Sequence, residues 1–171
     1  MSAIDSGQIF YRGGTPILNG NLAAPTAVMI RGVCVVNSSG AVALNGAASR
    51  PLGFLQSEVV LEVDYQELLR IPESVMFEVP VSGGDAKIKV QVLEIQDGIS
   101  YVAYGDVIHA STTFAVGDLV YAVAAGQIAK AANAAVGDFP IGRVTEIDIT
   151  VENTVDGGVV WKAESTLTAK T

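Results

Sequence analysis

The feature of this 171-residue chain that most constrains its fold is an internal repeat. Three short segments recur in the same order: Gly32–Val36, Gly40–Ala43 and Arg50–Leu55, then Gly117–Tyr121, Gly126–Ala129 and Phe139–Val144. The first segments begin 85 residues apart, and the final glycines, Gly53 and Gly142, lie 89 residues apart. Two small length changes in loops account for this drift. A repeated supersecondary unit predicts two similar structural units in one chain.

Each copy predicts a strand, a tight turn, a second strand, a loop of small residues and then a third strand. Proline and glycine open the third strand, as Pro51 and Gly53 in one copy and as Pro140 and Gly142 in the other. Proline is tolerated at a strand entrance because its missing N–H is not needed there. Glycine at this position indicates a bulge or a close approach of two backbones. The repeat therefore predicts a mainly β fold, as a small pseudo-symmetric barrel or a sandwich.

We expect the chain to be organised around this repeat. The predicted β domain covers residues 26–171, with repeat units at about 26–58 and 115–147 and an intervening β lobe at 59–105. Residues 1–25 predict an extended N-terminal arm, because turn-forming residues interrupt any sustained periodicity there. Five apolar residues lie within that polar stretch: Ile9, Phe10, Tyr11, Ile17 and Leu18. We expect them to anchor the arm on the chain's own surface or on a neighbouring subunit.

Turn signals predict where the strands reverse. Asn37–Gly40 predicts a turn, and Asn45-Gly46 predicts a two-residue hairpin. Ser82–Asp85 predicts a second hairpin, between strands at about 74–81 and 87–96. Asp156–Gly158 predicts a C-terminal hairpin between residues 142–152 and 159–167. These local signals indicate a mainly β chain.

Composition excludes several classes of function. The 18 acidic and 10 basic residues give a net charge of −8, and the basic ones are scattered, which disfavours binding to nucleic acid. The longest uncharged run, residues 13–30, contains prolines, glycines and asparagines, so it does not predict a membrane span. Half of the residues are hydrophobic and only 16% are charged, which allows a real core and favours a surface covered by a partner.

No catalytic, cofactor-binding or metal-binding residue is predicted. His109 is the only histidine, and no nucleophile-elbow motif accompanies it, so a Ser–His–Asp triad is disfavoured. Cys34, the only cysteine, lies in an apolar run that favours a buried thiol. Asp148, Glu152 and Asp156 lack the spacing of a calcium-binding loop. The acidic Glu58 and Glu62 are interpreted as a solvated face rather than a glycosidase pair.

The repeat also resembles a known family. The stretch from Gly117 through Gly126 to Val144 resembles small capsid cement proteins of tailed bacteriophages: a strand after Gly-Asp, a glycine turn, an Ala-rich loop, then Pro–aliphatic–Gly. Residues 25–58 are similar to the core segment of lambda-type head decoration proteins. Together these matches cover about a third of the chain. The resemblance implies a compact β fold that is β-tulip-like or a related barrel. It also implies a homotrimer and an N-terminal segment that contacts the major capsid protein.

The expected function is therefore structural. As a decoration protein, the chain would bind the outer surface of the capsid and stabilise the expanded shell, without a cofactor and without enzymatic activity. Deleting residues 1–25 would then weaken shell binding and leave a folded core. A carbohydrate-binding or adhesin-like domain of a head or tail fibre is the alternative, although it needs exposed aromatic rings and only 6% of residues are aromatic. An enzyme such as a glycosidase is the last alternative.

Overall fold

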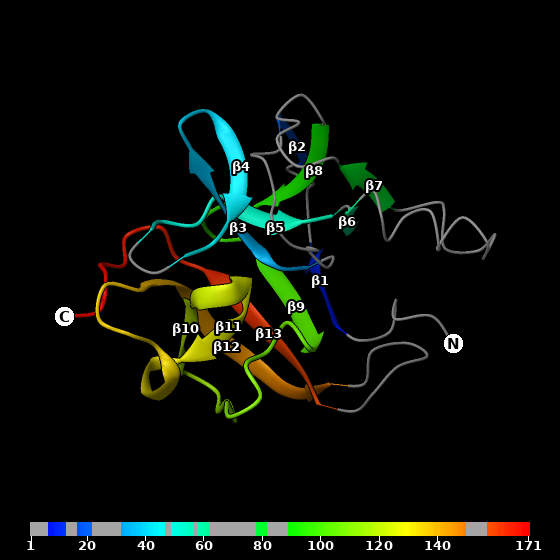
Figure 1. Cartoon of the computed structure of the whole chain (residues 1–171). Coiled ribbons are helices and arrows are strands. Elements are labelled where there is room, and N and C mark those ends of the chain that lie inside the picture. The colour runs from blue at the N-terminus through cyan, green and yellow to red at the C-terminus, as the bar shows by residue number, and fades with distance from the viewer. Residues whose placement is uncertain are drawn as a thin grey trace.

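The regular structure of the described residues consists mainly of β-strands, as the repeat predicts (Figure 1). The structure, a computed structural model, describes residues 7–12, 17–21, 32–46, 49–56, 58–61, 78–81, 89–149 and 157–171. Its strands are β1 (Gly7–Arg12), β2 (Ile17–Asn21), β3 (Cys34–Ser38), β4 (Ala41–Leu44), β5 (Gly53–Leu55), β6 (Glu58–Leu61), β7 (Glu78–Val81), β8 (Lys89–Glu94), β9 (Ser100–Gly105), β10 (Leu119–Ala122), β11 (Ile128–Lys130), β12 (Phe139–Ile149) and β13 (Gly158–Ala163). The mainly β fold built on an internal repeat is confirmed.

The two larger sheets have the same topology. One has the strand order β2-β8-β5-β3-β4, and the other has β1-β9-β13-β12-β10-β11. Without β1, each sheet places its five strands in the spatial order first, fifth, fourth, second, third. All pairings within both sheets are antiparallel. The duplication therefore extends over five strands, beyond the three that the sequence repeat shows.

Equivalent backbone hydrogen bonds confirm the match between the two five-stranded units. The N–H of Gly32 donates to Leu55 O at 2.7 Å, and the N–H of Gly117 donates to Val144 O at 2.9 Å. Both glycines have a positive φ, 89° and 92°, which glycine adopts without a steric penalty. The two units are therefore alike in their turns as well as in their strand order.

The Pro–aliphatic–Gly motif brings two backbones close together in both units. A Cβ on Gly53 would lie 2.2 Å from the carbonyl oxygen of Leu93 in β8, and one on Gly142 would lie 2.2 Å from that of Lys162 in β13. Real Cβ atoms do not approach an oxygen so closely. Each glycine is thus required by the strand that pairs beside it, as the sequence indicated.

The second unit closes on itself through the segment after β9. Ile108 forms a parallel bridge with Ile128 of β11, where Val107 O accepts the N–H of Ile128 at 2.8 Å. The N–H of His109 donates to Ile128 O at 2.9 Å. β9 is the first strand of the second unit and pairs with β13. The bridge therefore joins the segment that follows this first strand to β11, the third strand of the unit. The sheet curls into a barrel-like form.

Aromatic side chains from both units meet in one core. Phe54 of β5 packs edge-on against Trp161 of β13 at 5.7 Å between ring centroids, and Tyr101 of β9 stacks on Trp161 at 4.7 Å. All three residues are fully buried. The Tyr101 hydroxyl donates to Glu94 O at 2.6 Å and accepts the N–H of Gln96 at 2.9 Å. The first unit therefore packs against the second through this shared core.

Equivalent positions of the two units also face each other at one end of the molecule. Arg50 lies over the ring of Phe139, its counterpart, at 5.2 Å, and Pro51 and Pro140 line the same small pocket. Contacts between equivalent positions are expected around a local two-fold axis. The C-terminal segment crosses this junction, because Arg50 donates to the carbonyl oxygen of Ser165 at 3.1 Å.

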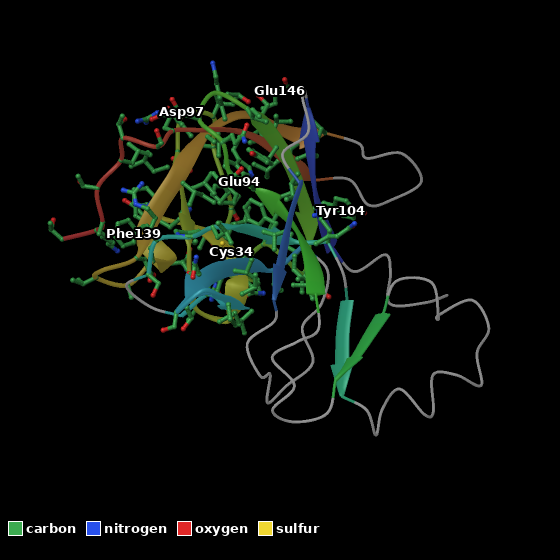
Figure 2. All side chains as sticks on the ribbon, turned by 90° about the horizontal axis from the view of Figure 1, so that it is seen from above. Cys34, Glu94, Asp97, Tyr104, Phe139 and Glu146 are labelled. Atoms are coloured by element: carbon green, nitrogen blue, oxygen red, sulfur yellow. The ribbon has the colours of Figure 1, made fainter. Side chains whose placement is uncertain are left out.

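Two of the predicted hairpins are wrong. At Asn45-Gly46 the chain does not fold β5 back on β4; both strands pair with β3, from opposite sides. In the second case β7 pairs in parallel with β6, whereas β8 pairs with β2 and β5; the predicted turn residues 82–85 lie outside the described residues. Figure 2 shows β6 and β7 beside the main body. The turn between β3 and β4 is confirmed, with positive φ at Ser39 and Gly40. The C-terminal hairpin of β12 and β13 is also confirmed.

Candidate assembly interface

The five apolar residues of the expected arm lie in two strands at sheet edges. Ile9, Phe10 and Tyr11 belong to β1, which pairs with β9, and Ile17 and Leu18 belong to β2, which pairs with β8. The expected arm is thus extended over β1 and β2. Contact of these residues with a neighbouring subunit stays a prediction.

The strand pairing assigns β2 to the first duplicated unit, whereas the expected division of the chain at residue 25 stays a prediction. β2 is the counterpart of β9 and is the first strand of the first unit, whereas β1 has no counterpart in that unit among the described strands. Likewise, β8 and β9, which lie within the expected lobe at 59–105, belong to the two sheets. The pattern of short apolar runs could not show to which sheet β2 and β8 belong, because these strands pair with residues far away in the sequence.

Two identical turns present apolar side chains to solvent. The sequence Ala-Val-Gly-Asp occurs at 115–118 and at 135–138, and its central valines, Val116 and Val136, are 63% and 74% exposed. Within each turn the aspartate carboxylate accepts the alanine N–H, and glycine has a φ of 92° or 93°. The sequence analysis did not predict these turns, although the repeated tetrapeptide is a signal that could have identified them.

Both turns are hydrogen-bonded to a neighbouring strand or to the C-terminal tail. In the first, the N–H of Gly117 donates to Val144 O at 2.9 Å; in the second, the N–H of Gly137 donates to Lys170 O at 2.8 Å. The Lys170 ammonium group also donates to Ala131 O at 2.6 Å. The exposed valines therefore stand in hydrogen-bonded turns, which suits contact with a partner surface at little entropic cost.

The described residues near His109 do not form a catalytic triad. His109 Nδ1 accepts the backbone N–H of Ser111 at 3.3 Å, so this nitrogen is engaged by the backbone rather than by a carboxylate. His109 lines an open pocket of about 340 Å³ together with Phe114, Ile147 and Asp148. Asp148 has a φ of 55° and lies where the β12–β13 register shifts, so a β-bulge accounts for its backbone conformation.

The other candidate groups are not brought together by the part of the chain that the structure describes. Within it, no group of three or more His, Cys, Asp or Glu residues could hold a metal ion. Glu152, Asp156 and Glu62 lie outside the described residues, and Glu58 begins β6. No helix among the described residues is long and apolar enough to cross a membrane.

Cys34 is expected to resist alkylation in the native protein. Its side chain is fully buried among Phe54, Leu93 and other core residues, and burial raises the pKa of the thiol well above its usual range (Figure 2). Since the thiolate is the reactive form, a maleimide or iodoacetamide should label the folded protein at pH 8 far more slowly than the unfolded protein. Mass spectrometry with and without denaturant measures this difference. Equal labelling rates would show that the core around Cys34 is open.

Among the described residues, the candidate contact surfaces are thus the edge strands β1 and β2 and the two turns with exposed valines. Comparison of the chain with protein-family models, with curated proteins and with solved structures finds no match.

Proposed function

We propose that this protein is a structural virion component that binds the outer surface of a tailed-bacteriophage capsid and stabilises the expanded shell. The observation that carries the proposal is the duplicated three-strand element. The stretch that resembles cement proteins forms β10, β11 and β12, and its repeat forms β3, β4 and β5 with the same pairing. Both copies of the motif that carries the resemblance therefore form the same three-strand element in this chain.

The physical properties of the described residues support a binding role of this kind. Residues of both units share one buried core, and the two exposed valines stand in hydrogen-bonded turns. A cement protein needs many modest contacts, which copy number multiplies into a stable clamp. The net charge of −8 suits the outer face of a shell better than the face that meets the packaged genome. In this proposal the partners are the major capsid protein and further copies of the chain, as a homotrimer.

The first test is quantitative mass spectrometry of purified virions. A copy number equal to that of the major capsid protein, or to another simple lattice fraction of it, supports a shell-covering cement. A handful of copies per particle would instead indicate a fibre or vertex protein. Absence from virions would overturn the proposal.

Burial of the aromatic side chains argues against the carbohydrate-binding alternative. A sugar-binding surface needs an exposed aromatic face, yet the described aromatic side chains are mainly in the core: Phe54, Tyr101, Tyr104, Phe114, Tyr121 and Trp161. Trp161, the sole tryptophan, is fully buried. We therefore expect a glycan array to show no binding, and clear binding of one glycan class would restore this alternative.

Deleting residues 1–12 is expected to weaken shell binding at least tenfold and leave both units folded. Removal of β1 spares every strand of the duplicated units, whereas deletion of residues 1–25 would also remove β2, which pairs with β8. Deletion of residues 1–12 therefore tests the role of β1 in shell binding without removing a strand of either unit. Co-sedimentation with undecorated capsids measures binding, and circular dichroism measures folding.

A deletion of residues 1–6 is the matched control, because it leaves β1 intact. It should bind capsids like the full-length chain. If the 1–12 deletion also binds like the full-length chain, the N-terminal strand has no part in attachment.

A further inference from the structure

The outer edge of β9 is covered along its whole length by β1. The two strands are six residues each, and they pair in an unbroken antiparallel register from Gly7 opposite Gly105 to Arg12 opposite Ser100. An uncovered edge of this length would present a row of unpaired N–H and C=O groups, which is a template for other strands. The edge of β9 is therefore a site that requires a strand as its occupant.

The second unit is complete without that occupant. β9 pairs with β13 on its inner side, and the segment that follows β9 closes the unit through the bridge between Ile108 and Ile128. The first unit uses the same five-strand order with no described strand at the position equivalent to β1. Withdrawal of β1 would thus expose the edge of β9 and leave the five-strand framework of the unit intact.

We propose that the edge of β9 is a strand-acceptor site, and that β1 of a second copy of this chain occupies it in the assembled state. The match of length and register between β1 and β9 is the argument for this occupant, since the neighbour's strand is chemically identical to the one displaced. Exchange of identical elements is a low-cost route to association, because the incoming strand forms the same hydrogen bonds as the strand that it replaces. Figure 1 shows β1 beside β9 at the margin of the sheet, where such exchange leaves the other strands in place.

The inference deepens the proposed function, on which its assembled state rests, by naming the contact between neighbouring copies. Each copy of the chain has a net charge of −8, so two copies repel each other. Salt screens this repulsion and should therefore promote strand exchange. Backbone pairing itself does not depend on charge.

Disulfide trapping between two single-cysteine variants tests the exchange. Arg12→Cys and Ser100→Cys occupy paired positions of β1 and β9. When a tagged R12C protein is mixed with untagged S100C protein and oxidised, strand pairing between molecules brings the two cysteines together and raises the yield of mixed disulfide above that of random collisions. The matched control is a mixture of R143C and K162C, which are paired positions in β12 and β13 inside the second unit. Native Cys34 is fully buried and remains in all variants.

The expected result is a mixed disulfide dimer that exceeds the control several-fold and grows with protein concentration and with salt. The double variant R12C/S100C reports the pairing itself. An internal bond in the double variant, without mixed dimers above the control, would overturn the exchange. Failure of the double variant to form any bond would overturn the β1–β9 pairing and the proposal with it. Virion copy number is measured separately, so a chain that covers capsids without exchange refutes only this inference.

Discussion

A Gly142→Ala substitution is expected to lower the free energy of unfolding by about 3 kcal/mol, the upper part of the range for overpacked sites. The new methyl group would lie 2.2 Å from the carbonyl oxygen of Lys162 and 2.8 Å from the Trp161 ring. Neither neighbour can withdraw easily, because Lys162 O belongs to the backbone of β13 and Trp161 is fully buried. Gly53→Ala meets the equivalent contact with Leu93 O and should cost a similar amount. Urea unfolding followed by circular dichroism measures both.

Two other glycines separate crowding from backbone conformation. Gly46 has no atom within 4 Å of an added Cβ, so Gly46→Ala should change the stability by less than about 0.5 kcal/mol. Gly40 is equally open but has a φ of 85°, so Gly40→Ala should cost about 1 kcal/mol through backbone strain alone. A Gly142→Ala protein as stable as Gly46→Ala would contradict the close approach of β12 and β13. If Gly142→Ala does not fold, its soluble yield beside Gly46→Ala gives the same answer.

These glycines also show how far the sequence predicts the fold. Gly53 and Gly142 follow a proline by two positions in both copies, and this local pattern predicted a close approach of backbones correctly. The identity of the approaching strand could not be predicted. It is β8 in one unit and β13 in the other, and β8 is separated from β5 by the inserted β6–β7 pair.

The wrong hairpins have the same physical origin. Asn45-Gly46 is favourable turn chemistry, but the N–H of Asn45 donates to Cys34 O at 3.0 Å and the chain continues past β3 to its far side. Turn residues report only the local backbone, whereas strand order depends on which apolar faces meet across the core. The turn at Ser39-Gly40 was predicted correctly because its two strands are adjacent in sequence and in space.

The candidate interface was predictable in part. The apolar residues of the N-terminal segment marked where strands lie, but the division of that segment between two sheets required the pairing of β1 and β2. The exposure of Val116 and Val136 could not be inferred from their apolar character, which alone would have placed them inside. Burial depends on the turn geometry that holds them out.

A Phe54→Ala substitution is expected to cost about 3 to 5 kcal/mol of stability, the range for truncating a large buried aromatic side chain. Phe54 is the aromatic residue that the first unit places in the shared core, where its ring contacts Trp161 at 5.7 Å and Tyr101 at 6.0 Å between centroids. Because both neighbours belong to the second unit, the loss should reach both units at once. Val136→Ala is the matched control: its side chain is 74% exposed, and its loss should change the stability by less than about 0.5 kcal/mol.

The sole tryptophan makes the coupling between the units measurable. Trp161 lies in the second unit, so its fluorescence reports the surroundings of β13, whereas far-ultraviolet circular dichroism reports the strands of both units. Since one core joins the units, the two signals should change in a single coincident transition, and Phe54→Ala should move both midpoints to lower denaturant by the same amount. If the fluorescence midpoint stayed in place while the dichroism transition split in two, the units would fold independently. The aromatic cluster would then be a contact between separate domains rather than the core that unites the duplicated fold.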